Sequence, residues 1–207
     1  MPANVAEWDA RYREAAQNAA SEPAGIVSEW LPMLPRGSAL DIACGTGRHA
    51  LLLAGRGEAV TAVDWSATGL EVLERRARNA KFAVRRADAA ALAERDKPRA
   101  GELLLIQANL EEIQLPIASF SVILCVQYLQ RSLFTQMSRA LSPGGLLLFE
   151  TFTRAQLDYS NGPRNPAYLL EPGELRAAFP ELHVLFYREL NAGQGIASLV
   201  AQKPLRD

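Results

Sequence analysis

The chain has 207 residues, of which 49% are hydrophobic, and this size and composition favour one domain with a sizeable core. Its formal net charge of −1 gives no indication of binding to nucleic acid or to an anionic membrane. The apolar runs are too short to cross a bilayer, and residues 1–9 lack the features of a signal sequence, so we expect a cytoplasmic protein.

The first third of the chain alternates helical and extended patterns. Pro32 and Pro35 end the second helical pattern, because proline cannot continue a helical hydrogen-bond ladder. We predict helices at residues 5–19, 24–33 and from 48 to Gly55 or Gly57, and strands at 38–43 and 58–63.

Residues 67–97 contain glycine only at position 69, no proline, and many Ala, Leu, Glu and Arg residues. This composition predicts one long helix or two stacked helices. The segment also carries a basic run made of Arg75, Arg76, Arg78, Lys81, Arg85 and Arg86. That run would suit a phosphate or an RNA, but the acidic residues interleaved with it favour a solvated face.

The second half of the chain predicts more crossover units and a closing hairpin. Strands fit 102–107, 120–126 and 146–149, with a helix before a turn at 141–145, and two last strands fit 183–190 and 195–202. Strands that alternate with helical segments predict a parallel sheet. The short turn before residue 195 predicts that the last two strands pair antiparallel. A loop at 153–170 and a short helix near Pro172 separate the two groups.

The end of the first predicted strand carries the most specific signal. Residues 41–47 read Asp-Ile-Ala-Cys-Gly-Thr-Gly, and glycines at such a bend let the main chain approach a ligand closely. Asp64 closes the next strand, where a carboxylate can accept both hydroxyl protons of a ribose. Together they predict a nucleoside-containing cofactor. Residues 45–50 also fit the weak dinucleotide pattern G-x-G-x-x-A, so a nicotinamide cofactor is an alternative.

Residues 41–47 resemble the first motif of class I S-adenosylmethionine-dependent methyltransferases. The Pro143-Gly144-Gly145 turn is similar to one in the same family, and Trp8-Asp9-Ala10-Arg11-Tyr12 resembles a segment of its small bacterial members, including the tellurite-resistance type. The resemblance implies a Rossmann-like α/β fold with a seven-stranded, mostly parallel sheet, helices on both faces and a C-terminal antiparallel hairpin. We expect a single domain over 1–207, with a helical cap at 1–35 and a substrate lid at 153–171.

The resemblance also implies which residues bind the cofactor. The acid and the glycine loop surround the methionine part, the acid of the second strand binds the ribose, and the following positions contact adenine. Asn109 stands where the family usually has Asp, although an amide can still read the adenine amino group. Main-chain carbonyls near Cys125 meet the ammonium group, and the N-terminal segment covers the cofactor. The candidates are Asp41, Gly45, Thr46, Gly47, Asp64, Trp65, Asn109, Leu110, Cys125, Tyr12 and Arg13.

The acceptor side is expected above the carboxyl ends of the later strands, where open α/β sheets bind ligands. The candidate substrate residues are Arg131, Thr153, Asn161, Arg164 and Tyr168. Either arginine would suit an anionic substrate, and salt bridges that shape the loop are an equal alternative. Glu150 and Tyr128 are the candidate catalytic groups if the nucleophile starts protonated. Neither Cys44 nor Cys125 has a His or Cys at metal-ligand spacing, so we expect no metal.

These observations predict S-adenosylmethionine-dependent methyl transfer to a small-molecule acceptor by in-line displacement. One alternative is a non-catalytic protein that binds S-adenosylmethionine or S-adenosylhomocysteine on the same fold. A second is a NAD-dependent oxidoreductase, which would need a catalytic Tyr/Lys or His pair that the spacing does not offer. The chain has no Asn-Pro-Pro-Tyr segment after the fourth strand, which argues against methylation of base or amide nitrogens.

Overall fold

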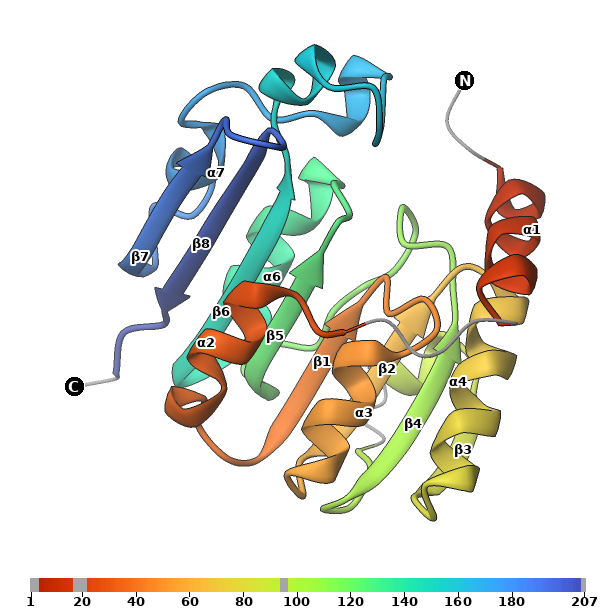
Figure 1. The fold of residues 1–207 in the computed structure, drawn as a ribbon. Coiled ribbons are helices and arrows are strands. Elements are labelled where there is room, and N and C mark those ends of the chain that lie inside the picture. The colour runs from red at the N-terminus through yellow and green to blue at the C-terminus, as the bar shows by residue number, and fades with distance from the viewer. Residues whose placement is uncertain (1–3, 17–21, 94–96, 206–207) are drawn as a thin grey trace.

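The computed structural model describes residues 4–16, 22–93 and 97–205. Within them an eight-stranded sheet has the order β3-β4-β2-β1-β5-β6-β8-β7 (Figure 1). The strands are β1 (Ser38–Ile42), β2 (Ala59–Asp64), β3 (Ala83–Ala87), β4 (Glu102–Gln107), β5 (Phe120–Val126), β6 (Leu141–Phe152), β7 (His183–Leu190) and β8 (Ile196–Gln202). β1 to β6 pair in parallel, and β8 runs antiparallel to both β6 and β7. The mostly parallel sheet with a C-terminal hairpin is confirmed.

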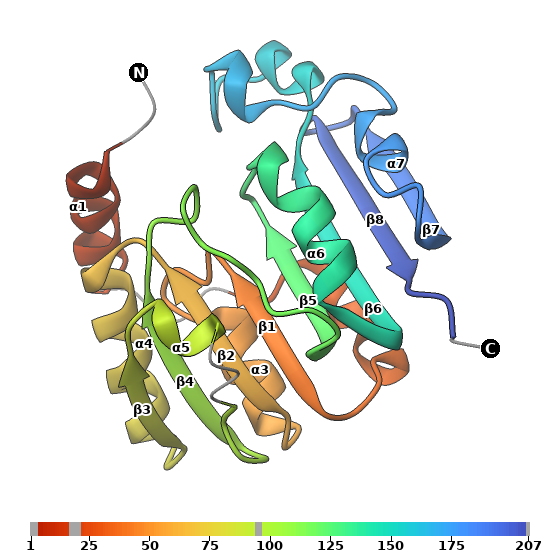
Figure 2. The ribbon, with the colours of Figure 1, turned by 180° about the vertical axis from the view of Figure 1, so that it is seen from behind.

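Helices cover both faces of this sheet. The α-helices are α1 (Val5–Ala15), α2 (Gly25–Trp30), α3 (Arg48–Gly55), α4 (Ala67–Asn79), α5 (Ala90–Ala93), α6 (Phe134–Ala140) and α7 (Glu174–Ala177). One buried apolar cluster packs α2, α3 and α4 on one face, and the other packs α5, α6 and α7 on the opposite face (Figures 1 and 2). No described helix is long and apolar enough to cross a membrane.

The prediction of helices alone at residues 67–97 is wrong, because this segment also contains β3. α4 ends at Asn79, and Lys81 then adopts a left-handed φ of 66°, which turns the chain. Residues 83–87 pair with β4 as a parallel edge strand, so sheet hydrogen bonding outweighs a helix-favouring composition. The sheet therefore has eight strands rather than seven.

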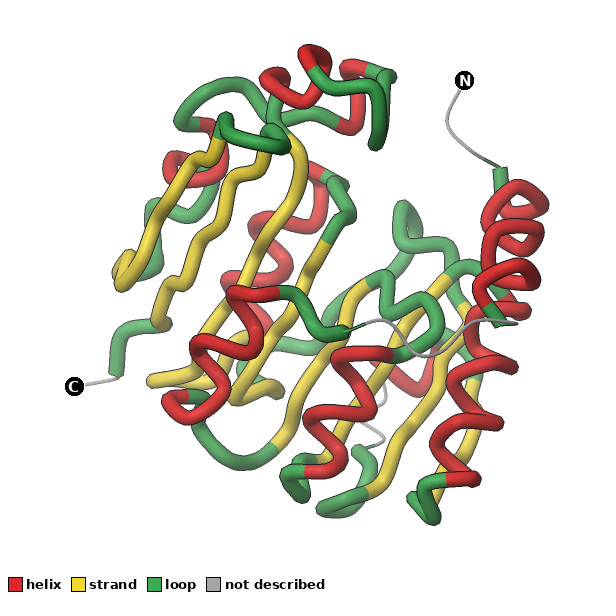
Figure 3. The backbone as a smooth tube through the Cα atoms, in the orientation of Figure 1, coloured by secondary structure: helices red, strands yellow, loops and turns green. Residues whose placement is uncertain are grey.

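Other boundaries shift by a few residues. α1 ends at Ala15, and the predicted extension to residue 19 reaches residues 17–21, which lie outside the described part. The second predicted helix is α2 continued by a 3-10 turn at Leu31–Met33. β6 begins at Leu141, so it includes the predicted glycine turn as an irregular start. The segment at 153–171, called the lid segment below, follows β6 and contains 3-10 turns at Arg154–Asp158 and Pro166–Tyr168 (Figure 3).

The topology brings the candidate residues to one edge of the sheet. Because β1, β2, β4, β5 and β6 are parallel, the residues that follow them all lie at the same carboxyl edge. The order of the sheet reverses direction at β1, whose neighbours are β2 and β5. This is the switch point at which open α/β sheets bind ligands.

Candidate functional site

The glycine loop, residues 43–47, leaves β1 through three left-handed conformations. The φ angles are 56° at Ala43, 53° at Gly45 and 84° at Gly47. A Cβ on Gly47 would lie 2.1 Å from Cδ1 of Leu73 in α4, which no real contact allows. Glycine is therefore required at position 47 both by its backbone conformation and by its packing. Ala43 bears a strain that glycine would not.

Asp64 at the end of β2 holds the glycine loop. It is 5% exposed; its Oδ2 accepts a hydrogen bond from the Gly45 amide at 2.7 Å, and its Oδ1 accepts one from the Ser66 amide at 2.8 Å. Burial raises the pKa of this carboxyl group, and these amides partly oppose the rise. The carboxylate is thus fixed in direction, and each oxygen keeps a further lone pair for a ligand.

Asp41 in β1 is a buried acid at this edge with an unsatisfied oxygen. It is 1% exposed, and its Oδ2 has no hydrogen-bond partner among the described residues. Burial, with a smaller contribution from nearby Asp64, raises the pKa of Asp41 to about 7, although the main chain of Ala50 and the Arg48 guanidinium lower it. An orphaned buried carboxylate oxygen is costly unless something pairs with it. Asp41 and the loop therefore fit a cationic ligand.

α1 places an aromatic side chain against the glycine loop. A Cβ on Gly45 would lie 2.9 Å from the Tyr12 hydroxyl oxygen, and a Cβ on Gly69 would lie 3.0 Å from Cδ2 of the same ring. The Tyr12 ring is therefore seated between two glycines from different elements, and it stacks on Trp8 at 5.8 Å. Arg13, the neighbouring candidate, is exposed on α1. Burial raises the pKa of Tyr12.

The candidates for the adenine end follow β2 and β4. Trp65 is 38% exposed directly after Asp64, and its main-chain oxygen accepts a hydrogen bond from the Gln107 amide group at 3.3 Å. Asn109 accepts from the Glu111 amide at 3.1 Å and donates to Glu112, so it also shapes its own turn. Three cofactor candidates remain. Leu110 and Cys125 are buried, and the Cys125 thiol donates to the Tyr128 main-chain oxygen. The main-chain oxygen of Thr46 accepts a hydrogen bond from Arg76.

Glu150 and Tyr128 lie at the ends of β6 and β5. Glu150 is 9% exposed, and its Oε2 accepts a hydrogen bond from the Ser198 hydroxyl in β8 at 2.6 Å. Burial raises the pKa of Tyr128, with smaller contributions from Cys125 and other groups, so its phenol stays protonated and acts as a donor at neutral pH. Of the two, Glu150 is the group that can accept a proton.

The lid segment is held by hydrogen bonds within it and by others from Arg131, which lies outside it after β5. Arg131 donates to both carboxylate oxygens of Glu174, at 2.5 and 2.9 Å, and to the main-chain oxygens of Ala167 and Leu169. Arg164 donates to the main-chain oxygens of Leu157 and Tyr159, within the lid segment. These contacts favour the alternative in which both arginines shape the loop.

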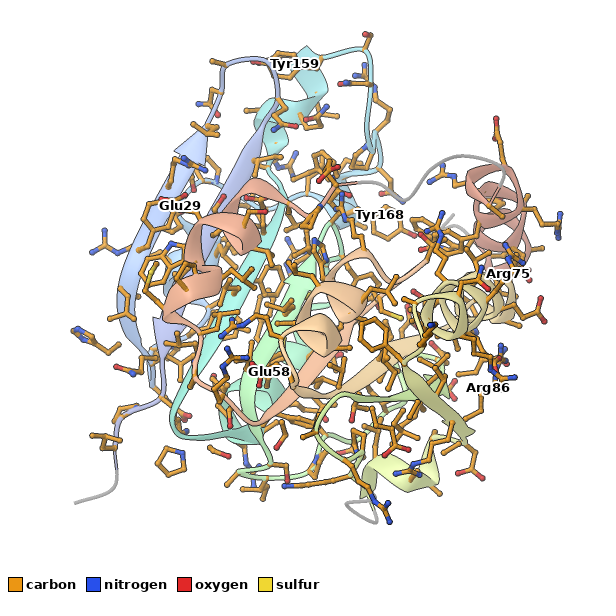
Figure 4. The ribbon with its side chains drawn as sticks, turned by 60° about the horizontal axis from the view of Figure 1, so that its bottom comes forward. Glu29, Glu58, Arg75, Arg86, Tyr159 and Tyr168 are labelled. Atoms are coloured by element: carbon orange, nitrogen blue, oxygen red, sulfur yellow. The ribbon has the colours of Figure 1, made fainter. Side chains whose placement is uncertain are left out.

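The other acceptor candidates also belong to this segment. Asn161 accepts two hydrogen bonds from the Gln156 amide group, and Gln156 in turn accepts one from the Gly195 amide at 3.0 Å. Thr153 is 3% exposed, and its hydroxyl has no partner among the described residues. Figure 4 shows Tyr159 at the outer tip of the lid segment and Tyr168 nearer the middle of the molecule.

Sequence reasoning missed Arg48, which follows the glycine loop. Its guanidinium donates to the main-chain oxygen of Glu22 at 3.2 Å and to Oε1 of Gln127 at 3.1 Å. Burial lowers the pKa of Arg48, and the nearby carboxylates of Asp41 and Glu150 oppose that shift. A charged residue opening an otherwise apolar helix was the available signal. Gln127 has a left-handed φ of 58°, which no sequence pattern predicts.

The basic run on α4 and β3 reaches this edge through Arg76, which donates to the Thr46 main-chain oxygen at 3.4 Å, and other members of the run pair with acidic residues. Glu74 pairs with Arg78 at 2.6 Å and with Arg86 at 2.7 Å, and Arg85 pairs with Glu102 at 3.2 Å. Figure 4 shows Arg86, with Arg75, on the outer side of these elements. Such pairing is typical of a solvated face. Among the described residues, no group of three or more His, Cys, Asp or Glu side chains could hold a metal ion.

Comparison with known families identifies the class of protein. A family model described as a methyltransferase domain matches residues 40–149, which is more than half of the chain. The chain belongs to this family. The resemblance to class I S-adenosylmethionine-dependent methyltransferases is thereby confirmed, and S-adenosylmethionine is the cofactor of this class. A search of curated proteins found no match.

Solved structures show the same fold at low sequence identity. TehB from Haemophilus influenzae has a TM-score of 0.69 and 16% identity, over 95% of this chain and 67% of that one. An S-adenosylmethionine-dependent methyltransferase from Mesorhizobium loti has a TM-score of 0.62 and 17% identity, over 87% and 98%. Geranyl diphosphate C-methyltransferase from Streptomyces coelicolor A3(2), solved with S-adenosyl-L-homocysteine, has a TM-score of 0.61 and 14% identity, over 86% and 75%.

Proposed function

We propose that the chain binds S-adenosylmethionine at the carboxyl edge of β1 and β2 and transfers its methyl group to a small-molecule acceptor. One observation carries the proposal: the buried Oδ2 of Asp41 has no partner within the described part of the chain and lies beside a glycine loop that Asp64 holds in place. Asp41, Asp64 and Glu150 are all buried at this edge, so it gathers carboxyl groups that a cofactor with sulfonium and ammonium groups would stabilise in their ionised form.

Each half of the cofactor has matching residues. The glycine loop and Asp41 would hold the methionine part, and Asp64 would accept the two ribose hydroxyls through its free lone pairs. Trp65, Asn109 and Leu110 would line the adenine, since they follow β2 and β4, which are neighbours in the sheet on one side of β1. Tyr12 would cover the loop from α1. When bound, S-adenosylmethionine supplies a methyl group that its sulfonium already makes electrophilic.

The protein has little chemistry to add, and its main task is to position the acceptor and exclude water. Holding two reactants in attack geometry can lower a barrier by roughly 7–11 kcal/mol in favourable cases. The lid segment follows the carboxyl end of β6 and would keep the site dry. Glu150 can take the proton of a protonated nucleophile, with Ser198 fixing the direction of its carboxylate. The Tyr128 phenol can donate a hydrogen bond to the acceptor.

A methyl-transfer screen tests this function directly. Labelled S-adenosylmethionine would be incubated with thiols, amines, carboxylates and oxyanions, and the wild type compared with Glu150→Gln. We expect turnover with one acceptor class and a loss of at least tenfold in the variant, since general base catalysis contributes about 10²–10⁴-fold. Tight cofactor binding with no turnover across the screen would instead support the non-catalytic binding protein. Fluorescence titration that detected NADH but not S-adenosylmethionine would support the oxidoreductase.

A further inference from the structure

Asp9 on α1 joins this helix to the start of α4. Its Oδ1 accepts hydrogen bonds from the Ser66 hydroxyl and from the Thr68 amide, the latter at 3.3 Å. The Ser66 hydroxyl itself accepts from the Gly69 amide at 3.0 Å and so caps α4. The hydrogen bond to Ser66 lowers the pKa of Asp9, so its carboxylate is ionised at neutral pH. Asp9 thus acts as a second cap, donated by a helix distant in sequence.

Asp9 is connected to two parts of the proposed cofactor site, Asp64 and the glycine loop. Ser66 donates its amide to Oδ1 of Asp64 at 2.8 Å, so the residue that Asp9 holds also fixes the proposed ribose ligand. Tyr12 lies three residues after Asp9, hence on the same face of α1. Its ring fits between Gly45 and Gly69, where a side chain at either glycine would collide with it. Asp9 therefore links Asp64 to Tyr12, two residues that would contact the cofactor from different elements.

We propose that Asp9 is a positioning residue that couples the docking of α1 to cofactor binding. It keeps Tyr12 over the glycine loop and keeps the Ser66 amide aligned with Asp64. The inference rests on the proposed function, because it takes S-adenosylmethionine as the ligand enclosed. Coupling is reciprocal, so a docked α1 must strengthen cofactor binding by the same free energy with which the cofactor holds α1 in place.

The experiment uses the full chain and three kinds of variant. Asp9→Ala removes both hydrogen bonds, and Asp9→Asn keeps one oxygen that can accept them. Glu7→Ala is the matched control, because Glu7 is an exposed acid on the same helix. Wild-type binding of S-adenosylmethionine is measured first by calorimetry. No binding there would refute the proposed function itself, before any variant is compared.

The readouts are the cofactor dissociation rate and hydrogen exchange of α1 with and without S-adenosylmethionine. We expect Asp9→Ala to release the cofactor roughly five- to tenfold faster, as the loss of a helix cap predicts. We expect Asp9→Asn to recover part of that loss and Glu7→Ala to match the wild type. S-adenosylmethionine should protect α1 from exchange in the wild type and protect it less in Asp9→Ala.

A double-mutant cycle separates this role from a merely structural one. If Asp9 acts by holding Tyr12, Asp9→Ala should add little to the loss of affinity caused by Tyr12→Ala. Additive losses would rule out the route through Tyr12. An Asp9→Ala protein that is less stable in urea yet has an unchanged dissociation rate and unchanged protection of α1 by the cofactor would overturn the coupling as a whole.

Discussion

The two halves of the carboxyl edge use their charged residues in opposite ways. Around β1 and β2, Asp41 has an oxygen without a partner among the described residues, and the oxygens of Asp64 accept from main-chain amides. Around β6 and the lid segment, Arg131 donates to a carboxylate and two carbonyls, and Arg154 pairs with Glu171. The first half keeps capacity for a ligand, and the second half uses its charges to hold the loop.

This difference supports our proposal that the first half, around β1 and β2 and called the cofactor half, binds the cofactor. Cofactor recognition depends on main-chain geometry that glycine and a strand-end acid impose locally. Acceptor recognition depends on loops whose side chains could face either a ligand or one another, and the structure shows Arg131 and Arg164 donating to the main chain of the lid segment. Variants at Gly47, Asp41 and Arg131 should show whether the cofactor half is the one that faces the ligand.

The largest effect is expected at Gly47. Gly47→Ala combines a left-handed φ of 84° with a Cβ only 2.1 Å from Leu73. Gly57→Ala is the control, because Gly57 has a similar φ of 88° and no described atom lies within 4 Å of the place that its Cβ would take. We expect Gly57→Ala to lower the free energy of unfolding by about 1–2 kcal/mol. Gly47→Ala should lose a further ~1–3 kcal/mol from overpacking and bind S-adenosylmethionine poorly. Equal losses in urea unfolding would contradict this account of the loop.

A middle-sized effect is expected from pH, through Asp41. Its pKa of about 7 lies above the ordinary 3.8, so ionising it costs the unliganded protein stability as pH rises from about 4 to 7. A cationic cofactor binds the ionised form, so its affinity should rise with pH, at most about tenfold per unit, and level off above about 7. Calorimetry in two buffers of different ionisation enthalpy should show proton release on binding below that pH. A flat profile in the wild type, or the same rise in Asp41→Asn, would rule out this role.

The smallest effect on cofactor binding is expected at Arg131. Arg131→Gln removes the contacts to Glu174 and to two carbonyls of the lid segment, so residues 153–171 should exchange amide hydrogens severalfold faster. The dissociation constant for S-adenosylmethionine should stay within about twofold, as for a residue outside the cofactor half. Arg154→Gln, which breaks a more exposed pair with Glu171, should change less. A large loss of cofactor affinity in Arg131→Gln would contradict the separation of the carboxyl edge into a cofactor half and a half that only holds the loop.

The sequence predicted the parallel sheet because its signals are short-range patterns, and the candidate cofactor residues, which stay a prediction, were likewise chosen from short local motifs. Alternating strands and helices specify a parallel sheet, and a short turn specifies the hairpin of β7 and β8. β3 escaped prediction because its alanines and arginines favour a helix, and its pairing with β4 depends on residues about 20 positions away. The roles of Asp9 and Ser198 could not be predicted for the same reason, since their hydrogen-bond partners are distant in sequence.

The most direct test of the central claim is the affinity of an Asp64→Ala variant for S-adenosylmethionine, measured by calorimetry beside the wild type. The loss of the ribose ligand, together with the freed amides of Gly45 and Ser66, should weaken binding well over tenfold. A folded Asp64→Ala protein with the affinity of the wild type would contradict the assignment of this edge as the cofactor site.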